Sequence, residues 1–426
     1  MLGFLGWTID AMDFFTVSTS ATAIAASLHV SITQVTWGVT LVLMLRSVGA
    51  FIFGTWADTY GRKWPYIGCC LCFVAFELGT GFSKTYSQFL ACRALFGISM
   101  GGMYGVAAAT ALENAPPRAH SVLSGLFLPG YNLGYLLAVI FYRAFEFTNH
   151  GEGWRSLFWF SAGPAFVLAI WRLCFGEGEY FVQLRAKRLS SGEDTMKLRI
   201  HEIRNVLKYY WLIFLYLIFL MAGFNFMSHG TQDLYPTLLT NQLKLSPNAK
   251  TVTLVVVNLG AIAGGIFFGQ LSEILGRRLT LIIGCLWCGA FVYPGFMLSS
   301  QSGIMAGYFF LQFGVMGCWG IAPIHLLELS PPTYRAFVSG FAYQLGNLAS
   351  SASSTIEATI GSRFPLPKLG PTAYNYAKVM CIFSGCVFAY MMIIVFLGPE
   401  NFHRDLHAYV KEEKSEGEKQ VEELEA

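Results

Sequence analysis

The sequence predicts an all-α membrane protein in which twelve transmembrane helices form two pseudo-symmetric six-helix bundles. The first observation is composition: of 426 residues, 54% are hydrophobic and 12% are charged. A soluble globule of this size needs more charged residues to cover its surface. The second observation is the number of long apolar runs, and the third is a repeat that relates the two halves of the chain.

Twelve apolar runs are long enough to cross a bilayer, which takes about twenty helical residues. They are Gly3–Leu28, Gln34–Ala57, Trp64–Phe82, Tyr86–Leu112, Ser121–Tyr142, Ser156–Phe175, Tyr209–Thr240, Thr251–Ile274, Leu279–Leu298, Met305–Leu327, Phe337–Ile360 and Val379–Leu397. An even number of crossings puts both termini on one side, and that side holds most of the Lys and Arg residues outside the runs. The positive-inside rule therefore places both termini and the central loop in the cytoplasm. The first run is too long for a cleavable signal peptide.

The repeat lies in the loops that follow the second and eighth runs and directly after the fourth and tenth runs. Gly54-x-x-x-Asp58-x-x-Gly61-Arg62-Lys63 recurs 215 residues later as Gly269-x-x-x-Glu273-x-x-Gly276-Arg277-Arg278, and Glu113-x-x-Pro116-Pro117 recurs as Glu328-x-x-Pro331-Pro332. One shared offset of half the chain length is typical of membrane proteins built from structural repeats. The chain thus divides into a first bundle at 1–175, a cytoplasmic linker at 176–208, a second bundle at 209–398 and an acidic cytoplasmic tail at 399–426.

The repeated loops also predict a gate. Their glycines allow tight turns and close packing, while an acid and a basic pair can form a charge clasp on the cytoplasmic side. The expected gating residues are Asp58, Arg62, Glu113, Glu273, Arg277 and Glu328.

Polar residues gather at the end of the seventh run. Asn225, His229, Gln232 and Asp233 fall at i, i+4, i+7 and i+8, which is one face of a helix. Such a stripe is costly in hydrocarbon, so it should face a water-filled cavity or a polar partner. The alternative is a buried polar cluster that holds helices together.

This stretch carries a resemblance. It reads Asn-x-x-Ser-His-x-Thr-Gln-Asp-x-x-x-Thr from Asn225 to Thr237, which is similar to the signature of the fungal Jen family of carboxylate/proton symporters. The chain from Trp7 to about Phe396 resembles the same family, which belongs to the major facilitator superfamily. The resemblance implies the major facilitator fold and proton-coupled uptake of short-chain carboxylates such as lactate and pyruvate by alternating access. It also implies a plasma-membrane location, no enzymatic activity, and no cofactor besides the proton as coupling ion.

The first two runs carry ionisable residues. Asp10-x-x-Asp13 puts two carboxylates on adjacent turns, where their repulsion favours retention of a proton by one of them. The pair resembles the Asp-x-x-Asp of related organic-acid/proton symporters, and a structural pair with a basic residue is the alternative for Asp13. Arg46 lies in the middle of the second run, where its fork suits a carboxylate. A permanent salt bridge to Asp10, Asp13 or Glu77 is the alternative.

The eleventh run carries amides. Gln344 and Asn347 can bind a hydroxyl or keto group beside a carboxylate, and their spacing resembles the family's specificity pair. An interhelical contact is the alternative. We expect Ser351 and Ser354 to continue the same face.

The remaining candidates are Asn132 at the pseudo-symmetric place in the fifth run, with Phe127, Pro129 and Tyr131 as pocket walls. Arg93 is expected to be structural or proton-coupling, and Glu357 and His325 to reach water.

The hypothesis is a secondary transporter whose substrate-binding residues are Arg46, Asn225, Gln232, Gln344, Asn347 and Asn132. His229 and Asp233, with Asp10 and Asp13, would couple protons. The expected partners are a small carboxylate and the lipid bilayer, without nucleic acid, and trafficking or turnover machinery at the acidic tail. The alternatives are a dicarboxylate symporter for succinate or malate, or a non-transporting carboxylate sensor. A sugar or drug porter would not need Arg46 or the histidine–aspartate pair.

Overall fold

The computed structural model describes residues 2–112, 129–148, 152–177, 204, 208–330, 335–367 and 374–400. The helices of the first half are α1 (Leu2–Ser27), α2 (Ile32–Tyr60), α3 (Lys63–Phe82), α4 (Tyr86–Leu112), α6 (Pro129–Phe145) and α7 (Gly153–Leu173). Those of the second half are α10 (Trp211–Gln232), α11 (Tyr235–Thr237), the π-helix η3 (Leu238–Gln242), α12 (Pro247–Leu275), α13 (Arg277–Met297), α14 (Gln301–Leu329), α15 (Arg335–Ser350), α16 (Ser353–Gly361) and α17 (Tyr376–Leu397).

Within these ranges the helices make twelve passes, because α10 continues through α11 and η3, and α15 continues into α16. Eight of the described helices are long and apolar enough to cross a membrane. The pass that contains α1 carries Asp10 and Asp13, and the pass formed by α15 and α16 is interrupted. Neither of these two passes is among the eight, whereas α2 with Arg46 and α10 with His229 are.

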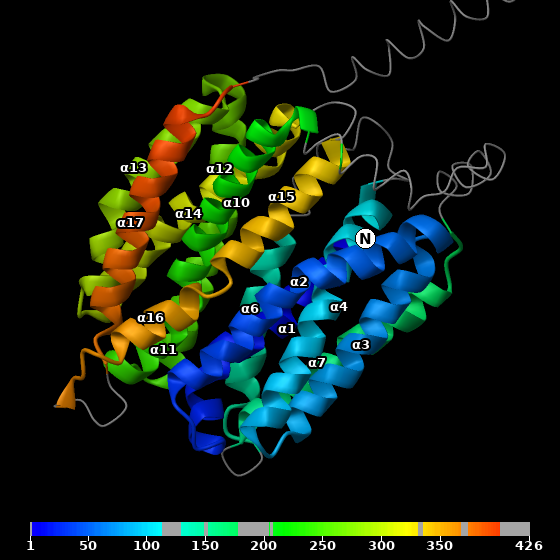
Figure 1. Ribbon diagram of the computed structural model, residues 1–426. Coiled ribbons are helices and arrows are strands. Elements are labelled where there is room, and N and C mark those ends of the chain that lie inside the picture. The colour runs from blue at the N-terminus through cyan, green and yellow to red at the C-terminus, as the bar shows by residue number, and fades with distance from the viewer. Residues whose placement is uncertain are drawn as a thin grey trace, which may run out of the picture.

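The two halves use the same helix pairs. In the first half α2 packs on α4, α3 on α7 and α1 on α6, and in the second half α12 packs on α14, α13 on α17 and α10 on α15. Figure 1 shows the two groups of helices side by side. The turns after α2 and α12 correspond as well, since Gly61 and Gly276 have φ of +106° and +88°, which favours glycine.

Glycines set the distance between the paired helices. A Cβ atom at Gly101 of α4 would overlap the backbone of Arg46 in α2, and one at Gly264 of α12 would overlap the backbone of Phe313 in α14. These residues belong to glycine series at spacing four, which lets helix backbones approach closely in a membrane. The glycine series therefore mark packing surfaces between the paired helices.

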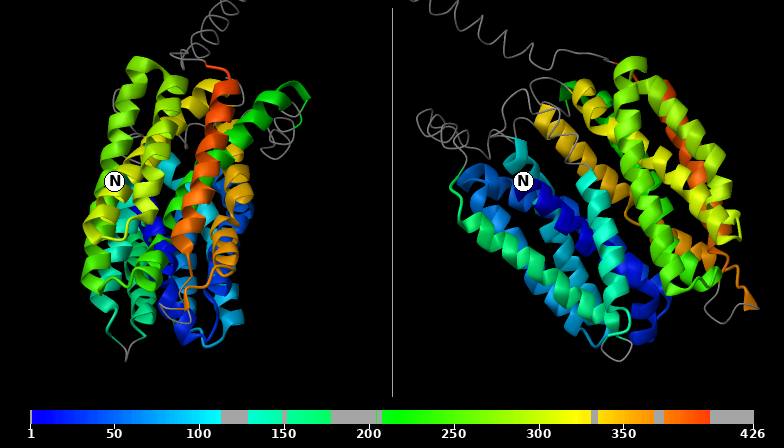
Figure 2. Two further views of the ribbon diagram at one scale, coloured as in Figure 1. Left: turned by 90° about the vertical axis from the view of Figure 1, so that its left-hand side faces the viewer. Right: turned by 180° about the vertical axis from the view of Figure 1, so that it is seen from behind.

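The halves meet mainly at one end. There, Lys250 Nζ of α12 donates to the carbonyl of Thr19 in α1 at 3.1 Å, and the hydroxyls of Thr40 in α2 and Thr355 in α16 lie 2.8 Å apart. Figures 1 and 2 show the groups leaning together at this end and apart at the end where α1 begins and α17 finishes. We call the first end the closed end.

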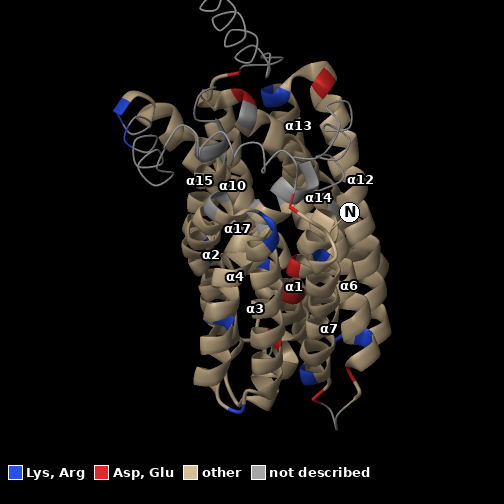
Figure 3. Ribbon diagram, turned by 90° about the vertical axis from the view of Figure 1, so that its right-hand side faces the viewer, with Lys and Arg blue, Asp and Glu red and all other residues tan. Residues whose placement is uncertain are grey.

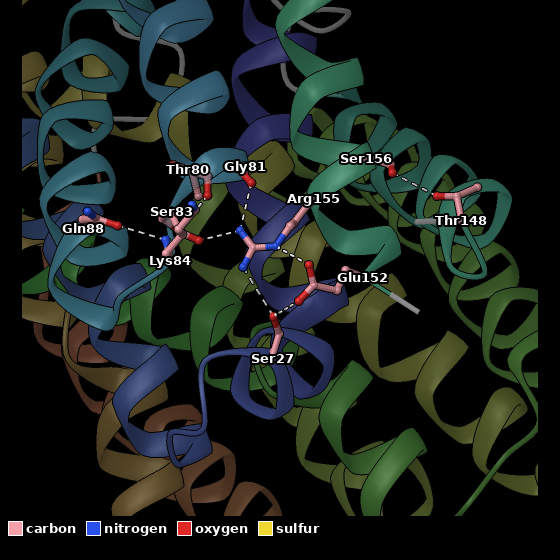
Figure 4. A network of polar contacts seen from close by, with 10 residues as sticks. All are labelled: Ser27, Thr80, Gly81, Ser83, Lys84, Gln88, Thr148, Glu152, Arg155 and Ser156. Atoms are coloured by element: carbon pink, nitrogen blue, oxygen red, sulfur yellow. Dashed lines mark hydrogen bonds and ion pairs between the residues drawn. The ribbon is translucent and has the colours of Figure 1, made fainter. Parts of the chain in front are cut away.

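A polar clamp fixes the loops of the first half at the closed end (Figure 4). Arg155 of α7 donates from Nη1 to the carbonyls of Gly81 and Ser83, and from Nε to Glu152 at 2.8 Å. Glu152 also accepts from the hydroxyl of Ser27 at 2.8 Å. The ends of α1 and α3 and the start of α7 are thereby joined.

Charged residues gather toward the helix ends, and few lie within the bundle (Figure 3). Large apolar side chains are instead exposed along the outer surface, for example Phe51, Phe166 and Ile266 at 51%, 49% and 58% exposure. Such a surface fits hydrocarbon. The few charges inside must therefore be paired or functional.

Replacement of Gly264 by alanine tests the close approach of α12 and α14. The added methyl forces the two backbones apart, and overpacking of this kind costs about 1–3 kcal/mol. We expect a lower unfolding temperature of the purified protein in detergent, measured by fluorescence-detected gel filtration. Gly289→Ala is the matched control, because a Cβ atom at Gly289 has nothing within 4 Å. Equal unfolding temperatures for both variants would contradict this packing.

Candidate functional site

Arg46 lies at the boundary between the two halves. Its side chain is 1% exposed, and its guanidinium carbon lies 5.9 Å from the ring centres of both Trp7 in α1 and Tyr343 in α15. Tyr343 is also a hydrogen-bonding partner of the guanidinium. Gly101 permits this position because it lets α4 pack directly on the backbone of Arg46. The cation is held by two aromatic rings from different halves.

Two nitrogens of the Arg46 guanidinium are free to bind a ligand. Nε and Nη2 of Arg46 have no hydrogen-bond partner among the described residues, and neither do the two carboxylate oxygens of Asp10. Asp10 is fully buried and interacts electrostatically with Arg46. Nε and Nη2 form the edge that binds a carboxylate with two parallel hydrogen bonds. The alternative interpretation, a permanent salt bridge from Arg46 to Asp10, Asp13 or Glu77, has no supporting contact among the described residues.

An aromatic wall extends from Arg46 toward the second half. Tyr131 of α6 stacks on Trp7 with ring centres 5.4 Å apart and meets Phe15 edge-on at 5.1 Å. Tyr131 interacts electrostatically with both Arg46 and Asp233. The expected role of Tyr131 as a wall residue agrees with this position, whereas Phe127 lies outside the described residues. The wall connects the cation of α2 with the carboxylate at the end of α10.

His229 and Asp233 form the second charged element. Nδ1 of His229 lies 3.3 Å and 3.2 Å from the two carboxylate oxygens of Asp233, one helical turn away. Both side chains are buried, and the ring of Phe14 in α1 meets the imidazole edge-on at 5.7 Å. The spacing of four residues places the pair correctly, and Asp233 lies directly after the last residue of α10.

The other two members of the predicted stripe behave differently. Gln232 turns to α14, where its amide nitrogen donates to Oε1 of Gln312 at 2.9 Å, and Gln312 donates to the hydroxyls of Thr231 and Tyr308. Asn225 donates to the carbonyl of Met221 at 2.8 Å within its own helix. Gln232 therefore faces a polar partner, the second of the two environments expected for the stripe, because α14 offers its long side chain an amide.

The amides of α15 and α6 are buried. Oε1 of Gln344, Oδ1 of Asn347 and Oδ1 of Asn132 have no hydrogen-bond partner among the described residues. Asn347 donates to the carbonyl of Tyr343 at 3.3 Å, so it lies one turn from the residue that contacts Arg46. Three acceptors are thus available on the elements that border the Arg46 cluster.

The predicted continuation of this face is wrong. α15 ends at Ser350 and α16 begins at Ser353, so Ser351 lies in the break and Ser354 lies in another helix. Ser351 donates to the carbonyl of Leu348. Period-based prediction assumes an unbroken helix, and no proline or glycine marks the break.

Asp13 belongs to a cluster inside the first half. Its electrostatic neighbours include Glu77 of α3 and Arg93 of α4, together with Asp10. Nη1 of Arg93 lies 2.9 Å from Glu77, and Ser161 of α7 donates to the same carboxylate at 3.5 Å. The two carboxylates expected to act together therefore have different basic neighbours, because the i, i+3 offset directs Asp10 to α2 and Asp13 to α3 and α4.

The charged residues expected to gate the second half lie in contact with one another. Arg277 contacts Glu273 at 2.7 Å and Glu328 at 3.0 Å, and it also donates to the hydroxyl of Ser272 at 2.8 Å. In the first half the backbone N–H of Arg62 donates to Glu177 at 2.8 Å. The side chain of Asp58 and the whole of Glu113 lie outside the described residues.

Glu357 and His325 do not reach water. Both are fully buried, and neither the carboxylate oxygens of Glu357 nor the ring nitrogens of His325 have a hydrogen-bond partner in the described ranges. The expectation that they reach water is wrong, because the packing around α14 and α16 buries both side chains completely.

Sequence reasoning did not identify Trp7 and Tyr343 as site residues. Trp7 lies one turn before Asp10, and Tyr343 directly precedes Gln344. A search for aromatic residues within one turn of the predicted polar residues would have found both. In the described residues no group of three or more His, Cys, Asp or Glu side chains could hold a metal ion.

Comparison with known proteins identifies the family. A model of the family described as "Sugar (and other) transporter" matches residues 1–411. The "Carboxylic acid transporter protein homolog" of Saccharomyces cerevisiae is 46% identical, over 100% of this chain and 71% of its own length. The "Sialic acid transporter NanX" of Escherichia coli is 26% identical, over 85% of this chain and 86% of its own.

Solved structures share the fold. The "Crystal structure of D-xylose-proton symporter" matches with a TM-score of 0.76 and 15% identity, over 94% of this chain and 97% of that one. The "Inward open conformation of the xylose transporter XylE from E. coli" matches with a TM-score of 0.74 and 16% identity, over 95% and 97%. The twelve-helix fold class and the resemblance carried by residues 225–237 are both confirmed. The chain belongs to the sugar (and other) transporter family of the major facilitator superfamily, within its Jen-type branch.

Proposed function

We propose that the protein carries short-chain monocarboxylates such as lactate and pyruvate across the plasma membrane together with protons, by alternating access. The observation that supports this most is the free edge of Arg46, with Nε and Nη2 both unpartnered at the boundary between the halves. A buried cation with a free fork binds a planar anion well, because the low dielectric strengthens the pairing. The name of the yeast relative, a carboxylic acid transporter protein homolog, agrees with this ligand.

The charges around Arg46 favour one carboxylate over two. Arg93 and Arg277, two other buried arginines of the described helices, already pair with Glu77 and Glu328. Asp10 and Asp233 both act electrostatically on Tyr131, so negative groups flank the aromatic wall. A second substrate carboxylate would meet these groups without a compensating cation. Like charges in a poorly solvated site destabilise binding.

The rest of a small acid can be bound by amides. The unpartnered oxygens of Gln344, Asn347 and Asn132 accept hydrogen bonds, so they suit the hydroxyl group of a 2-hydroxy acid. Asn225 and Gln232 contribute less directly, because each already donates to a protein acceptor.

Proton coupling follows from the two carboxylate elements. Asp10 competes with the substrate for Arg46, so a proton on Asp10 frees the guanidinium for the anion. His229 and Asp233 hold a second proton in a shared hydrogen bond. Entry of the anion with protons lowers the net charge carried across the apolar barrier, which is the physical reason for symport.

Alternating access requires the closed end to open. Its contacts include polar ones, such as Lys250 with Thr19 and Thr355 with Thr40, which can break and re-form. With both termini in the cytoplasm, the closed end faces outward.

Arg46→Lys tests the fork. Lysine keeps the charge but cannot present two parallel donors, and loss of a charge-assisted hydrogen bond of about 1.5–3 kcal/mol corresponds to a rise of about tenfold or more in KM. Labelled lactate uptake in a yeast lacking its own carboxylate permeases measures this. Arg363→Lys is the matched control, because Arg363 is exposed. An unchanged KM for Arg46→Lys would make Arg46 structural.

Asp233→Asn tests the proton relay. Asparagine cannot accept the shared proton, so we expect accumulation driven by a pH gradient to be lost, with the protein still present at the membrane. Asp233→Glu keeps a titratable group and should restore part of the accumulation. The measurement is labelled pyruvate uptake with and without a protonophore. Wild-type accumulation by the asparagine variant would remove Asp233 from the mechanism.

A substrate panel tests the preference for one negative charge. Lactate, pyruvate and acetate should compete with labelled lactate at both acidic and neutral pH. Succinate should compete at about pH 5, where much of it is the monoanion, and lose at least about tenfold in potency at about pH 7 as the second carboxyl ionises. Glucose is the negative control. Equal competition by succinate at both pH values would favour a dicarboxylate symporter.

A further inference from the structure

Glu357 is a buried carboxyl group without a partner. It is 0% exposed, and neither of its carboxylate oxygens has a hydrogen-bond partner within the described ranges. Burial of an unpaired carboxylate anion costs several kcal/mol, whereas the neutral acid is far less costly. Glu357 is therefore stable in this conformation as the protonated acid, and it becomes an anion only if its surroundings change.

The backbone directs Glu357 toward the His229–Asp233 pair. α16 packs on α10, and a Cβ atom at Gly230 would lie 3.5 Å from Oε1 of Glu357. Gly230 directly follows His229, and the absence of a side chain there makes room for the ring of Phe383 from α17, beside which the carboxyl group of Glu357 lies. Asp233 interacts electrostatically with Glu357. A proton on Glu357 is thus close to the relay.

The other elements around α16 contribute little charge. Tyr308 of α14 interacts electrostatically with Glu357, and the ring of Tyr376 in α17 packs against Gly361. On the side of α2, the hydroxyl of Thr355 contacts those of Thr40 and Thr36 at 2.8 Å and 3.1 Å. Asp233, with its partner His229, is therefore the charged neighbour that matters for the state of Glu357.

We infer that Glu357 is a proton-transfer residue that links the His229–Asp233 pair to water on the outer side of the membrane. The inference rests on the proposed symport. In the transfer, the O–H bond of the Glu357 acid breaks, an O–H bond forms on the Asp233 carboxylate, and the negative charge moves to Glu357. A proton from water on the outer side then restores the acid. No other reactant is needed.

The position of Thr355 connects this step to alternating access. Thr355 lies two residues before Glu357 and joins α16 to α2 of the other half through hydroxyl contacts at the closed end. The break between α15 and α16 separates this short helix from the part that contacts Arg46. When the halves part at the closed end, the Thr355 contacts break and water reaches Glu357. The residue therefore exchanges protons with the outside only in the outward-open state.

The test separates exchange from accumulation in vesicles that contain the purified protein. Counterflow of labelled lactate without a pH gradient requires substrate binding and alternating access. Accumulation under a pH gradient additionally requires proton coupling, and one pH unit supports about tenfold accumulation for one proton. The variants are Glu357→Gln, which mimics the protonated acid, and Glu357→Asp, which keeps a titratable group. Thr359→Val is the control for disturbance of α16, because this hydroxyl donates only to the carbonyl of Thr355.

We expect Glu357→Gln to retain counterflow within about twofold of wild type and to lose nearly all of the tenfold accumulation. Its counterflow should also lose the dependence on outer pH that the wild type shows. Glu357→Asp should recover part of the accumulation, and Thr359→Val should resemble the wild type.

Three results would overturn the inference. Accumulation and pH dependence like the wild type in Glu357→Gln would make Glu357 structural while leaving the proposed function intact. Loss of counterflow in Glu357→Gln with normal folding on gel filtration would show a role in packing or binding instead. Failure of the wild-type protein itself to exchange lactate or pyruvate would overturn the proposed function, and the inference with it.

Discussion

The structure depends on one buried cation whose charge is left incompletely paired. Arg46 lies between Trp7 of one half and Tyr343 of the other, with two nitrogens of its fork unpartnered. An incompletely hydrogen-bonded guanidinium is costly in a low-dielectric interior. Such a group persists only where the surrounding residues hold it in place. Gly101, which brings α4 onto the backbone of Arg46, and the two aromatic rings provide that support. The hydrogen bonds that Arg46 does not make within the protein can be made to an anionic ligand.

Buried charges fall into two groups with different consequences. Arg93 with Glu77, and Arg277 with Glu328, are paired within a half and hold its helices together. Arg46, Asp10 and Glu357 have unpartnered atoms, and each lies on an element at the boundary between the halves. A paired charge resists movement, because separation would leave both buried partners without a counter-ion. An unpartnered group is instead stabilised when a change in its surroundings supplies a hydrogen-bond partner. Alternating access requires two rigid halves and an interface between them whose contacts can change.

The symmetry of the two halves extends to groups that the repeated motif does not include. Glu177 accepts from the backbone N–H groups of Arg62 and Lys63, and Glu400 accepts from that of Arg278. Each carboxylate thus lies at the N-terminus of the helix that follows the repeated loop, where the helix dipole favours negative charge. These acids do not share the offset of 215 residues, so sequence comparison of the halves does not pair them. Only the fold shows that they are equivalent.

The sequence alone determined the class of fold, the twelve passes, the charge cluster around Arg277 and the pairing of His229 with Asp233. These features depend on composition, on a fixed offset or on helical spacing over one turn, which are local properties of the chain. The tertiary structure decided which polar groups share a site. It turned Gln232 toward Gln312, separated the neighbours of Asp13 from those of Asp10, broke the helix after Ser350 and buried Glu357. Each of these outcomes depends on what a neighbouring helix offers, and helical periodicity carries no information about the residues on the facing helix.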